Sequence, residues 1–375
     1  MKSKFVIVGS GFFGSVIAER IANELKKDVL ILESRNHIGG NCYSHFDENT
    51  GIEYHKYGTH IFHTSNKKVW DYINRFTEFN NYHHQVLSKF KNKIYQLPFN
   101  LETINTVYNK NLNPSNAEKF LFREIEKLKI NNPSNFEEKA LSMVGAKLYN
   151  MFIKNYTYKQ WGKKPINLPT SIINRIPVRF NYNEDYFINS RWQGIPINGY
   201  TAIFKNLLDN KKIKIVLNHN FEYEDITSYD HILYTGPLDK LFKYKFGKLD
   251  WRSLDFEKKI LKINDFQGNS VINYPELKHD FTRIHEPKHL HKERNYNNDK
   301  TLIIYEYPRN DFNKPYYPIN TKSNRTIHRK YKNLATKYKN LFIGGRLADY
   351  AYYDMDMTIS AALKLYENKI KKNII

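Results

Sequence analysis

The chain has a single cysteine, Cys42, among its 375 residues. One cysteine excludes an intrachain disulfide and a zinc site built from paired thiolates. This usage fits a reducing compartment, and we expect a cytoplasmic protein. The sequence also lacks an uninterrupted apolar run of about 18 residues, so we expect no transmembrane helix. Its first residues lead directly into a short apolar strand, without the pattern of a secretory signal peptide.

Acidic residues are scarce relative to basic ones. The 59 Lys and Arg outnumber the 38 Asp and Glu, which gives a net charge of +21. Such a charge fits an anionic partner, whether nucleic acid, lipid or a phosphorylated substrate. The basic residues are scattered, so we interpret most of this charge as solvated surface. We expect a phosphorylated small substrate, no nucleic-acid partner and no membrane insertion.

A glycine-rich turn lies between two apolar runs near the N-terminus. Residues 5–8 and 28–33 predict buried strands, and apolar residues at helical spacing predict a helix between them. The turn carries the GxGxxG pattern, whose glycines let a pyrophosphate approach the start of the helix. Glu33 ends the second strand, 19 residues after the last glycine, where a carboxylate can bind ribose hydroxyls. We therefore predict a dinucleotide site that includes Gly9, Gly11, Phe13, Gly14 and Glu33.

Two further features favour FAD over NAD as the cofactor. After Glu33 come Ser34, an arginine, a Gly-Gly pair and Asn41, which resembles the pattern of FAD proteins such as amine oxidases. Near the C-terminus, a strand at 341–343 leads into Gly344-Gly345 and a final helix from about Met355. The dipole at that helix N-terminus can stabilise negative charge on a reduced flavin.

The rest of the chain alternates between helical and strand-rich regions. We expect an α/β protein in which a FAD-binding Rossmann-type domain carries an inserted helical domain and an antiparallel β-sheet substrate domain. The Rossmann domain is expected to be discontinuous. The predicted boundaries are 1–80, 196–242 and 338–375 for the Rossmann domain, 100–172 for the helical domain, and 173–195 with 243–337 for the sheet domain.

Ten short motifs, in this order and spacing, resemble those of the UDP-galactopyranose mutase family. They are residues 56–64 (KYGTHIFHT), 97–100 (LPFN), 156–162 (YTYKQWG), 175–180 (RIPVRF), 193–196 (QGIP), 234–237 (YTGP), 282–284 (TRI), 315–318 (PYYP), 345–347 (GRL) and 352–355 (YYDM). The resemblance runs through nearly the whole chain.

The resemblance implies an isomerase that interconverts UDP-galactopyranose and UDP-galactofuranose. It further implies that N5 of reduced FAD attacks the sugar, that UDP leaves, and that the adduct opens and recloses with no net redox change. A homodimer and a product used for cell-surface polysaccharide are also implied. A lid near Arg175 is expected, because such an adduct needs shielding from water.

Residues of the motifs match family positions around the substrate. Arg175 and Arg283 match the two arginines that clamp the diphosphate, a role that suits a planar guanidinium. The tyrosines Tyr186, Tyr317 and Tyr352 match those that hydrogen-bond the phosphates. The remaining substrate-side residues implied by the resemblance are Tyr156, Thr157, Trp161, Arg252 and Asn273.

Other residues match positions at the flavin. His63 resembles the histidine that adjusts the flavin near N5, where an imidazole can donate or accept a hydrogen bond. His60 stands three residues earlier, but no third ligand suggests a metal site. The resemblance also implies cofactor contacts by Ile61, Arg346, Tyr353, Asp354 and Met355. No dedicated general base is assigned.

One position departs from the family pattern. His84 stands where many members have Asn, at a position that touches substrate in the family. An N-acetylated sugar such as UDP-GalNAc, a deoxy sugar or another nucleotide therefore stays open as the substrate.

Two other classes of function remain as alternatives. An amine-oxidase-like FAD oxidoreductase would share the N-terminal fingerprint but has no need of the arginine and tyrosine set. A basic nucleic-acid-binding protein would explain the charge, but the sequence contains no recognised nucleic-acid module.

Overall fold

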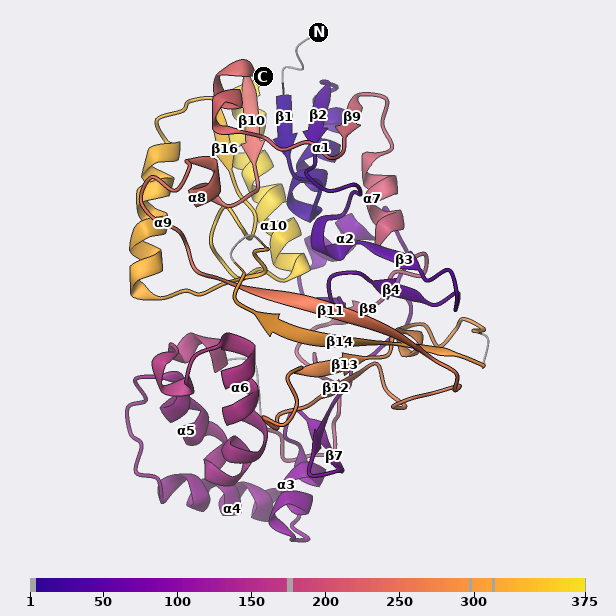
Figure 1. The fold of residues 1–375 in the computed structure, drawn as a ribbon, viewed down its shortest axis with the longest axis vertical. Coiled ribbons are helices and arrows are strands. Elements are labelled where there is room, and N and C mark those ends of the chain that lie inside the picture. Colours follow the sequence, from indigo (N-terminus) through magenta and orange to yellow (C-terminus); the bar gives the residue numbers. More distant parts are fainter. Residues whose placement is uncertain (1–4, 174–177, 297–298, 312–313, 375) are drawn as a thin grey trace.

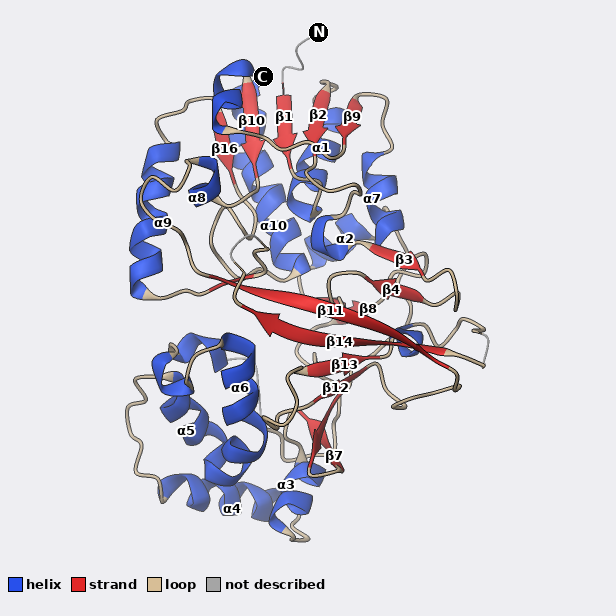
Figure 2. Ribbon diagram, viewed as in Figure 1, coloured by secondary structure: helices blue, strands red, loops and turns tan. Residues whose placement is uncertain are grey.

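The computed structural model describes residues 5–173, 178–296, 299–311 and 314–374. Three layers follow one another along its longest axis (Figures 1 and 2). A parallel sheet with its helices lies at one end, a long and mostly antiparallel sheet crosses the middle, and a group of helices lies at the other end. Within the described residues, no helix is both long enough and apolar enough to cross a bilayer.

The first layer is a five-stranded parallel sheet in the order β16-β10-β1-β2-β9. Its strands are β1 (Phe5–Val8), β2 (Val29–Leu32), β9 (Ile213–Val216), β10 (His231–Tyr234) and β16 (Leu341–Ile343). They come from three distant parts of the chain. Each is an almost continuous apolar run, because helices cover both faces of the sheet.

Alternate residues of the strands face the two helical layers. Phe5 and Ile7 of β1 pack with α1 (Phe12–Glu24), α2 (Lys67–Ile73), α7 (Tyr200–Leu208) and α10 (Met355–Leu365). Val6 faces the opposite side, toward α8 (Leu238–Leu241) and α9 (Lys322–Ala335). The last helix of the described residues is α11 (Lys371–Ile374).

The middle layer is a seven-stranded sheet in the order β15-β11-β14-β13-β12-β6-β7. Its long central pair, β11 (Trp251–Leu261) and β14 (Thr301–Arg309), runs antiparallel. The other strands are β6 (Val86–Phe90), β7 (Lys93–Leu97), β12 (Val271–Asn273), β13 (Arg283–His285) and β15 (Tyr317–Pro318). Beside it lie the short pairs β3 (Ser44–Phe46) with β4 (Glu53–His55), and β5 (Phe62–Thr64) with β8 (Trp192–Gly194).

The third layer contains α3 (Leu101–Tyr108), α4 (Pro114–Glu126), α5 (Phe136–Leu148) and α6 (Lys154–Trp161). The side chains of Asn100, Asn113 and Asn135 accept main-chain hydrogen bonds at the starts of the first three helices, which satisfies otherwise unpaired N–H groups. These helices bury their own apolar cluster.

The structure confirms the predicted fold class but differs from three predicted boundaries. Strands β6 and β7 (86–97) belong to the antiparallel sheet, although no domain was assigned to them. Of residues 173–195, β8 pairs with β5 instead of joining that sheet. Helix α9, expected in the sheet domain, packs on the parallel sheet through Tyr331 and Ala335, because its apolar face completes the core on that side.

Candidate functional site

The glycine turn between β1 and α1 has no room for side chains. Gly9 has φ +99°, and a Cβ there would lie 2.3 Å from Oγ1 of Thr235. A Cβ on Gly14 would lie 2.1 Å from the carbonyl oxygen of Gly9. The turn therefore brings bare main chain against the end of β10, next to the N-terminus of α1, where unpaired N–H groups favour an anion.

Glu33 is buried at the end of β2 and faces this turn. Its Oε2 accepts hydrogen bonds from the main-chain N of Ser10 at 2.9 Å and the hydroxyl of Ser10 at 2.7 Å. Its Oε1 accepts from the main-chain N of Arg35 at 2.9 Å. These bonds fix a carboxylate at the position that the sequence predicts for ribose recognition.

A cavity of about 570 Å³ lies along the ends of β1, β2, β10 and β16, within the size range of small-molecule and cofactor sites. Most of the predicted cofactor residues line it, namely Gly9, Gly11, Phe13, Gly14, Glu33, Ser34, Asn41, Arg346 and Met355. The N-terminal ends of α1 and α10 both contribute to its wall. The cavity thus lies at the carboxyl edge of the parallel strands, where such sheets bind nucleotides.

The other four predicted cofactor residues do not line this cavity. His60 donates its main-chain N–H to Nδ1 of His55 at 2.9 Å, and burial lowers the pKa of His60 to about 4. Ile61 packs in a small apolar cluster. The hydroxyl of Tyr353 donates to Asp349 at 3.1 Å, and Asp354 is the N-cap residue of α10. Their cofactor contacts stay predictions.

Sequence reasoning missed Arg35 as a cavity residue. Its guanidinium lies 4.2 Å from the ring centroid of Tyr57, and its Nη2 donates to Oδ1 of Asn41 at 2.9 Å. Its Nη1 is buried without a hydrogen-bond partner. A buried, unsatisfied cationic donor beside a phosphate-binding turn fits an anionic cofactor. The signal was present, since this arginine belongs to the motif that follows Glu33.

Arg346 links the cavity to a pair of predicted substrate tyrosines. Its guanidinium lies 6.0 Å from the ring centroids of both Tyr317 and Tyr352. These two rings stack at 5.8 Å with an interplanar angle of 14°. The structure therefore brings a cofactor-side cation and two phenol groups together, although Tyr317 lies 29 residues before Arg346 and 35 before Tyr352 in the sequence.

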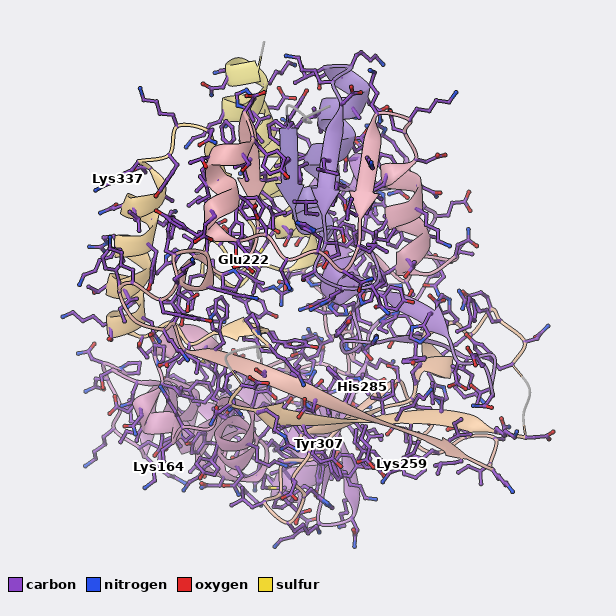
Figure 3. The ribbon with its side chains drawn as sticks, turned by 45° about the horizontal axis from the view of Figure 1, so that its top comes forward. Lys164, Glu222, Lys259, His285, Tyr307 and Lys337 are labelled. Carbon is purple, nitrogen blue, oxygen red and sulfur yellow. The ribbon has the colours of Figure 1, made fainter. Side chains whose placement is uncertain are left out.

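Arg283 lies at the centre of a buried polar cluster on β13 and β14. Its Nη2 donates to the hydroxyl of Tyr156, and its Nε lies 3.3 Å from Oε1 of Glu306. The other carboxylate oxygen of Glu306 is 3.0 Å from Nε2 of His285, whose Nδ1 lies 2.7 Å from Oγ1 of Thr59. His285 is buried, whereas Lys164, Lys259 and Lys337, labelled with it in Figure 3, are exposed.

The charges in this cluster are balanced. Burial raises the pKa of the Glu306 carboxyl, but Arg283 and His285 lower it more, so its pKa is lowered overall. Burial by itself lowers the pKa of Arg283, and Glu306 and Tyr156 raise it overall. Sequence reasoning made no prediction for Glu306, although a carboxylate directly after the apolar residues 302–305 of β14 was a usable signal.

His84 and His63 belong to a wall of stacked rings. Phe187 stacks on His63 at 3.8 Å and on His84 at 5.6 Å. Tyr186 contacts the edge of His84 at 5.6 Å, and its main-chain N donates to the carbonyl of His84 at 2.7 Å. Burial, with the nearby charge of Arg283, lowers the pKa of His84 to about 3, so this imidazole is neutral at physiological pH.

Asn273 presents an unsatisfied acceptor beside Arg283. The two residues are directly paired between β12 and β13. The Oδ1 of Asn273 and the hydroxyl of Ser88, its neighbour on β6, are buried without hydrogen-bond partners. Buried polar groups are normally paired, so these two atoms fit contacts with a ligand.

The remaining predicted substrate residues are placed differently. Thr157 is buried in α6, and Trp161 packs against the helical cluster. Arg252 is buried on β11 and donates to the carbonyls of Gln160 at 2.7 Å and Lys159 at 2.9 Å. Its charge therefore lies at the C-terminus of α6, a favourable position for a cation. Arg175, and with it the proposed lid, lies outside the described residues.

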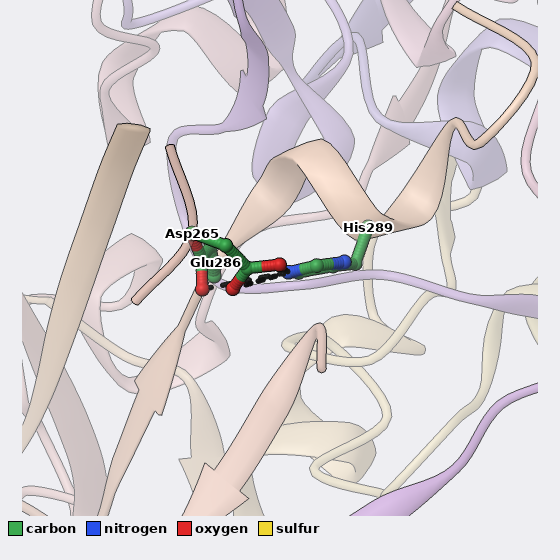
Figure 4. Close-up of side chains that lie close together, drawn as sticks. All are labelled: Asp265, Glu286 and His289. Carbon is green, nitrogen blue, oxygen red and sulfur yellow. Dashed lines mark hydrogen bonds and ion pairs between the residues drawn. The ribbon is translucent and has the colours of Figure 1, made fainter. Parts of the chain in front are cut away.

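One cluster away from these residues has the composition of a metal site. Asp265, Glu286 and His289 offer ligand atoms within 4.8 Å of one another (Figure 4). The carboxylate of Glu286 already accepts hydrogen bonds from Thr301 and from the main-chain N–H groups of Phe266 and Gln267. These bonds explain the arrangement as the closure of the 264–268 turn.

The fold and the cavity define a Rossmann-type protein with a flavin-type dinucleotide site. A family model described as UDP-galactopyranose mutase matches residues 151–352, and one described as NAD(P)-binding Rossmann-like domain matches 7–76. The chain is 40% identical over 380 residues to dTDP-fucopyranose mutase of Escherichia coli, covering 99% of each chain. It is 42% identical over 363 residues to a probable UDP-galactopyranose mutase of Klebsiella pneumoniae, covering 96% of this chain and 92% of that protein.

A crystal structure of reduced UDP-galactopyranose mutase has the same fold, with a TM-score of 0.79 at 15% identity, covering 99% of this chain and 94% of that one. The chain belongs to the UDP-galactopyranose mutase family, a family of isomerases.

Proposed function

We propose that this protein interconverts UDP-galactopyranose and UDP-galactofuranose with FAD as its cofactor. The observation that carries the proposal is the position of Arg283, Tyr317 and Arg346. The charges of both Arg283 and Arg346 act on the Tyr317 phenol, and Arg346, 6.0 Å from the centroid of that ring, lines the predicted dinucleotide cavity. A nucleotide sugar carries the diphosphate that such groups bind.

The residues around the cavity fit FAD. The glycine turn has no room for side chains, so a pyrophosphate could approach its main chain. The Glu33 carboxylate is placed to accept hydrogen bonds from ribose hydroxyls. The Nη1 of Arg35 is a buried donor without a partner in the protein. When bound and reduced, FAD would supply the electron-rich nitrogen of this family's chemistry. The N-terminus of α10, whose first residue Met355 lines the cavity, would stabilise negative charge there.

The chain's own residues would act on the UDP part of the substrate. Arg283, held by Glu306, would neutralise the charge that develops as the diphosphate leaves. The hydroxyls of Tyr317 and Tyr352 would donate to phosphate oxygens, and burial, which raises the pKa of Tyr317, keeps that donor protonated. Asn273 and Ser88 would bond the polar edge of the nucleotide through their unpaired atoms.

The test is turnover of UDP-galactofuranose by purified, FAD-loaded protein, with and without dithionite, followed by chromatographic separation of the two UDP-sugars. Conversion only under reducing conditions supports the proposal. A yellow protein that converts neither sugar would contradict the substrate while leaving the cofactor in place.

A mutase for a deoxy-sugar nucleotide is the second candidate. The 40% identity with dTDP-fucopyranose mutase over both whole chains favours it. His84 is the further observation, because its buried imidazole stacks on Phe187 and presents a ring where many members of the family have the amide of Asn. Parallel measurements of kcat/KM with the two nucleotide sugars would separate the candidates.

We further propose a cytoplasmic homodimer whose product enters cell-surface polysaccharide. The family resemblance supports this assembly and role, and the buried, single Cys42 is compatible with a reducing compartment. Light scattering of the purified protein would determine the subunit number.

A further inference from the structure

Lys159, a residue without an assigned role, ends in an unusual environment. Its side chain leaves α6 and its Nζ donates to four main-chain carbonyls. The acceptors are the oxygens of Tyr274 at 2.5 Å, Glu276 at 3.0 Å, His279 at 3.1 Å and Phe281 at 2.8 Å. An ammonium has three N–H donors, so this group is saturated by one short stretch of chain.

That stretch connects two strand ends that carry predicted substrate residues. Residues 274–281 run from Asn273 at the end of β12 to Arg283 at the start of β13, and these two residues are paired. The connection has no regular secondary structure, so no strand ladder satisfies its carbonyls, and of the four that Lys159 binds, that of Glu276 also accepts the N–H of His279 at 3.3 Å. Buried carbonyls without a hydrogen-bond donor destabilise the folded state. The Lys159 ammonium supplies donors to the carbonyls of this connection.

The same helix also carries the partner of Arg283. Tyr156 lies three residues before Lys159 in α6, and its hydroxyl accepts the hydrogen bond from Nη2 of Arg283. Arg252 binds the carbonyls of Lys159 and Gln160 at the end of the helix. Hydrogen bonds therefore join α6 to the sheet through Arg283, through Arg252 and through the connection between Asn273 and Arg283. The bonds to the connection are those of Lys159. Figure 1 shows α6 next to β14 of this sheet.

We infer that Lys159 is a positioning residue for the nucleotide-sugar site: its ammonium ties α6 to the β12–β13 connection and so sets Tyr156 against Arg283. This inference rests on the proposed function. Lys159 holds the geometry through the main chain and does not itself touch the substrate. Without the ammonium, the connection and the helix would separate, and the diphosphate site would lose its shape while the FAD cavity stayed intact.

The environment of Lys159 also makes this tie sensitive to alkaline pH. Burial lowers the pKa of Lys159 to about 8, although Asp280 and Glu276 favour its charged form. The other titratable groups near it are His279, whose pKa burial lowers, and Tyr274, whose pKa burial raises. Both are neutral between about pH 7 and 9. The cations Lys278 and Lys89 act on His279.

The experiment measures the affinity of the FAD-loaded protein for UDP by calorimetry and the KM for UDP-galactofuranose. Lys159→Met should weaken UDP binding about tenfold or more and raise KM more than it lowers kcat, with FAD content unchanged. Lys154→Met, which removes an exposed lysine from the same helix, is the matched control and should change neither value.

A pH series tests the inference without relying on the Met variant. The wild-type affinity for UDP should fall as pH rises through about 8, because the ammonium loses a proton there. In Lys159→Arg, whose guanidinium stays charged, the affinity should not fall over this range. UDP binding by Lys159→Met equal to that of wild type, or an unchanged pH profile in Lys159→Arg, would overturn the role of Lys159. Failure of the wild-type protein to bind UDP would overturn the proposed function, and this inference with it.

Discussion

Arg283 and Glu306 face each other across adjacent strands, with Nε of Arg283 3.3 Å from Oε1 of Glu306. His285, two residues after Arg283, points to the same face of β13 and bonds the other oxygen of the carboxylate. One buried carboxylate thus orients both a cation and an imidazole. The side chain of Glu306 is 4% exposed and that of Arg283 is 31% exposed, so part of the arginine stays accessible to a ligand while its anchor is buried.

Replacing the anchor should affect both stability and catalysis. Glu306→Gln removes the charge opposite Arg283 and leaves that guanidinium partly buried without its ion pair. We expect the free energy of unfolding to fall by about 2–4 kcal/mol, which overlaps the lower part of the range for breaking a buried ion pair. We also expect kcat/KM for the UDP-sugar to fall at least about tenfold, since Arg283 loses its orientation.

Urea unfolding and steady-state kinetics check this prediction. Glu257→Gln is the control, because Glu257 lies on β11 with 46% of its side chain exposed and pairs with Lys259, and surface pairs contribute about 0–1 kcal/mol. Equal effects of the two substitutions would refute the anchoring role of Glu306.

Gly9→Ala should abolish tight FAD binding. The new Cβ would collide with Thr235 at 2.3 Å, on main chain that must keep φ +99°. The turn would shift, and the N–H groups of α1 would no longer meet the pyrophosphate. Flavin absorbance per mole of purified protein measures the outcome. Gly51→Ala serves as the control, because Gly51 also has positive φ but has no atom within 4 Å of the added Cβ; full flavin loading of Gly9→Ala would contradict the prediction.

Arg35→Met should weaken FAD binding about tenfold, which corresponds to about 1.4 kcal/mol. The substitution keeps much of the apolar contact with Tyr57 but removes the buried donor that has no partner within the protein. Fluorescence titration of the apoprotein with FAD gives the dissociation constant. Arg191→Met removes an exposed arginine that stacks on Trp192 and should leave this constant unchanged. An Arg35 variant with wild-type affinity would exclude a contact with the cofactor.

The protein should lose stability in mild acid because it buries neutral imidazoles. Burial lowers the pKa of His60 from 6.5 to about 4 and that of His84 from 6.5 to about 3. Between these values and pH 6.5 the unfolded chain binds more protons than the folded protein, so the free energy of unfolding falls as pH falls through this window. His60 alone accounts for up to about 3 kcal/mol.

Thermal unfolding of the FAD-loaded protein at about pH 7.5 and about pH 5 measures this effect. His60→Gln, which keeps an N–H donor for the carbonyl of Gly58, should show a smaller drop in Tm between the two values. His83→Gln, which removes a histidine with 66% of its side chain exposed, should behave as wild type. A drop in His60→Gln as large as in wild type would mean that other groups cause the acid sensitivity.

The dinucleotide fold could be predicted because its signals are local. The strand at 5–8, the glycines and the strand ending in Glu33 lie within about thirty residues, and a parallel strand buried on both faces must be apolar. The strand predicted at 341–343 is also where the structure has it, as β16. The boundary errors arose where a segment's partner lies far away: nothing within 322–335 indicates that α9 covers the parallel sheet.

The amino-acid sequence by itself determined the class of fold, the cofactor turn and which types of side chain were available for a diphosphate. Only the tertiary structure decided which of them meet. Lys159 bonds carbonyls 115 to 122 residues away, and Glu306 reaches Arg283 through the register of two strands. Such contacts depend on how the helical layer and the sheet pack. That packing depends on the burial of many apolar residues. Their pattern in the sequence shows which side chains are buried but not which residues they contact.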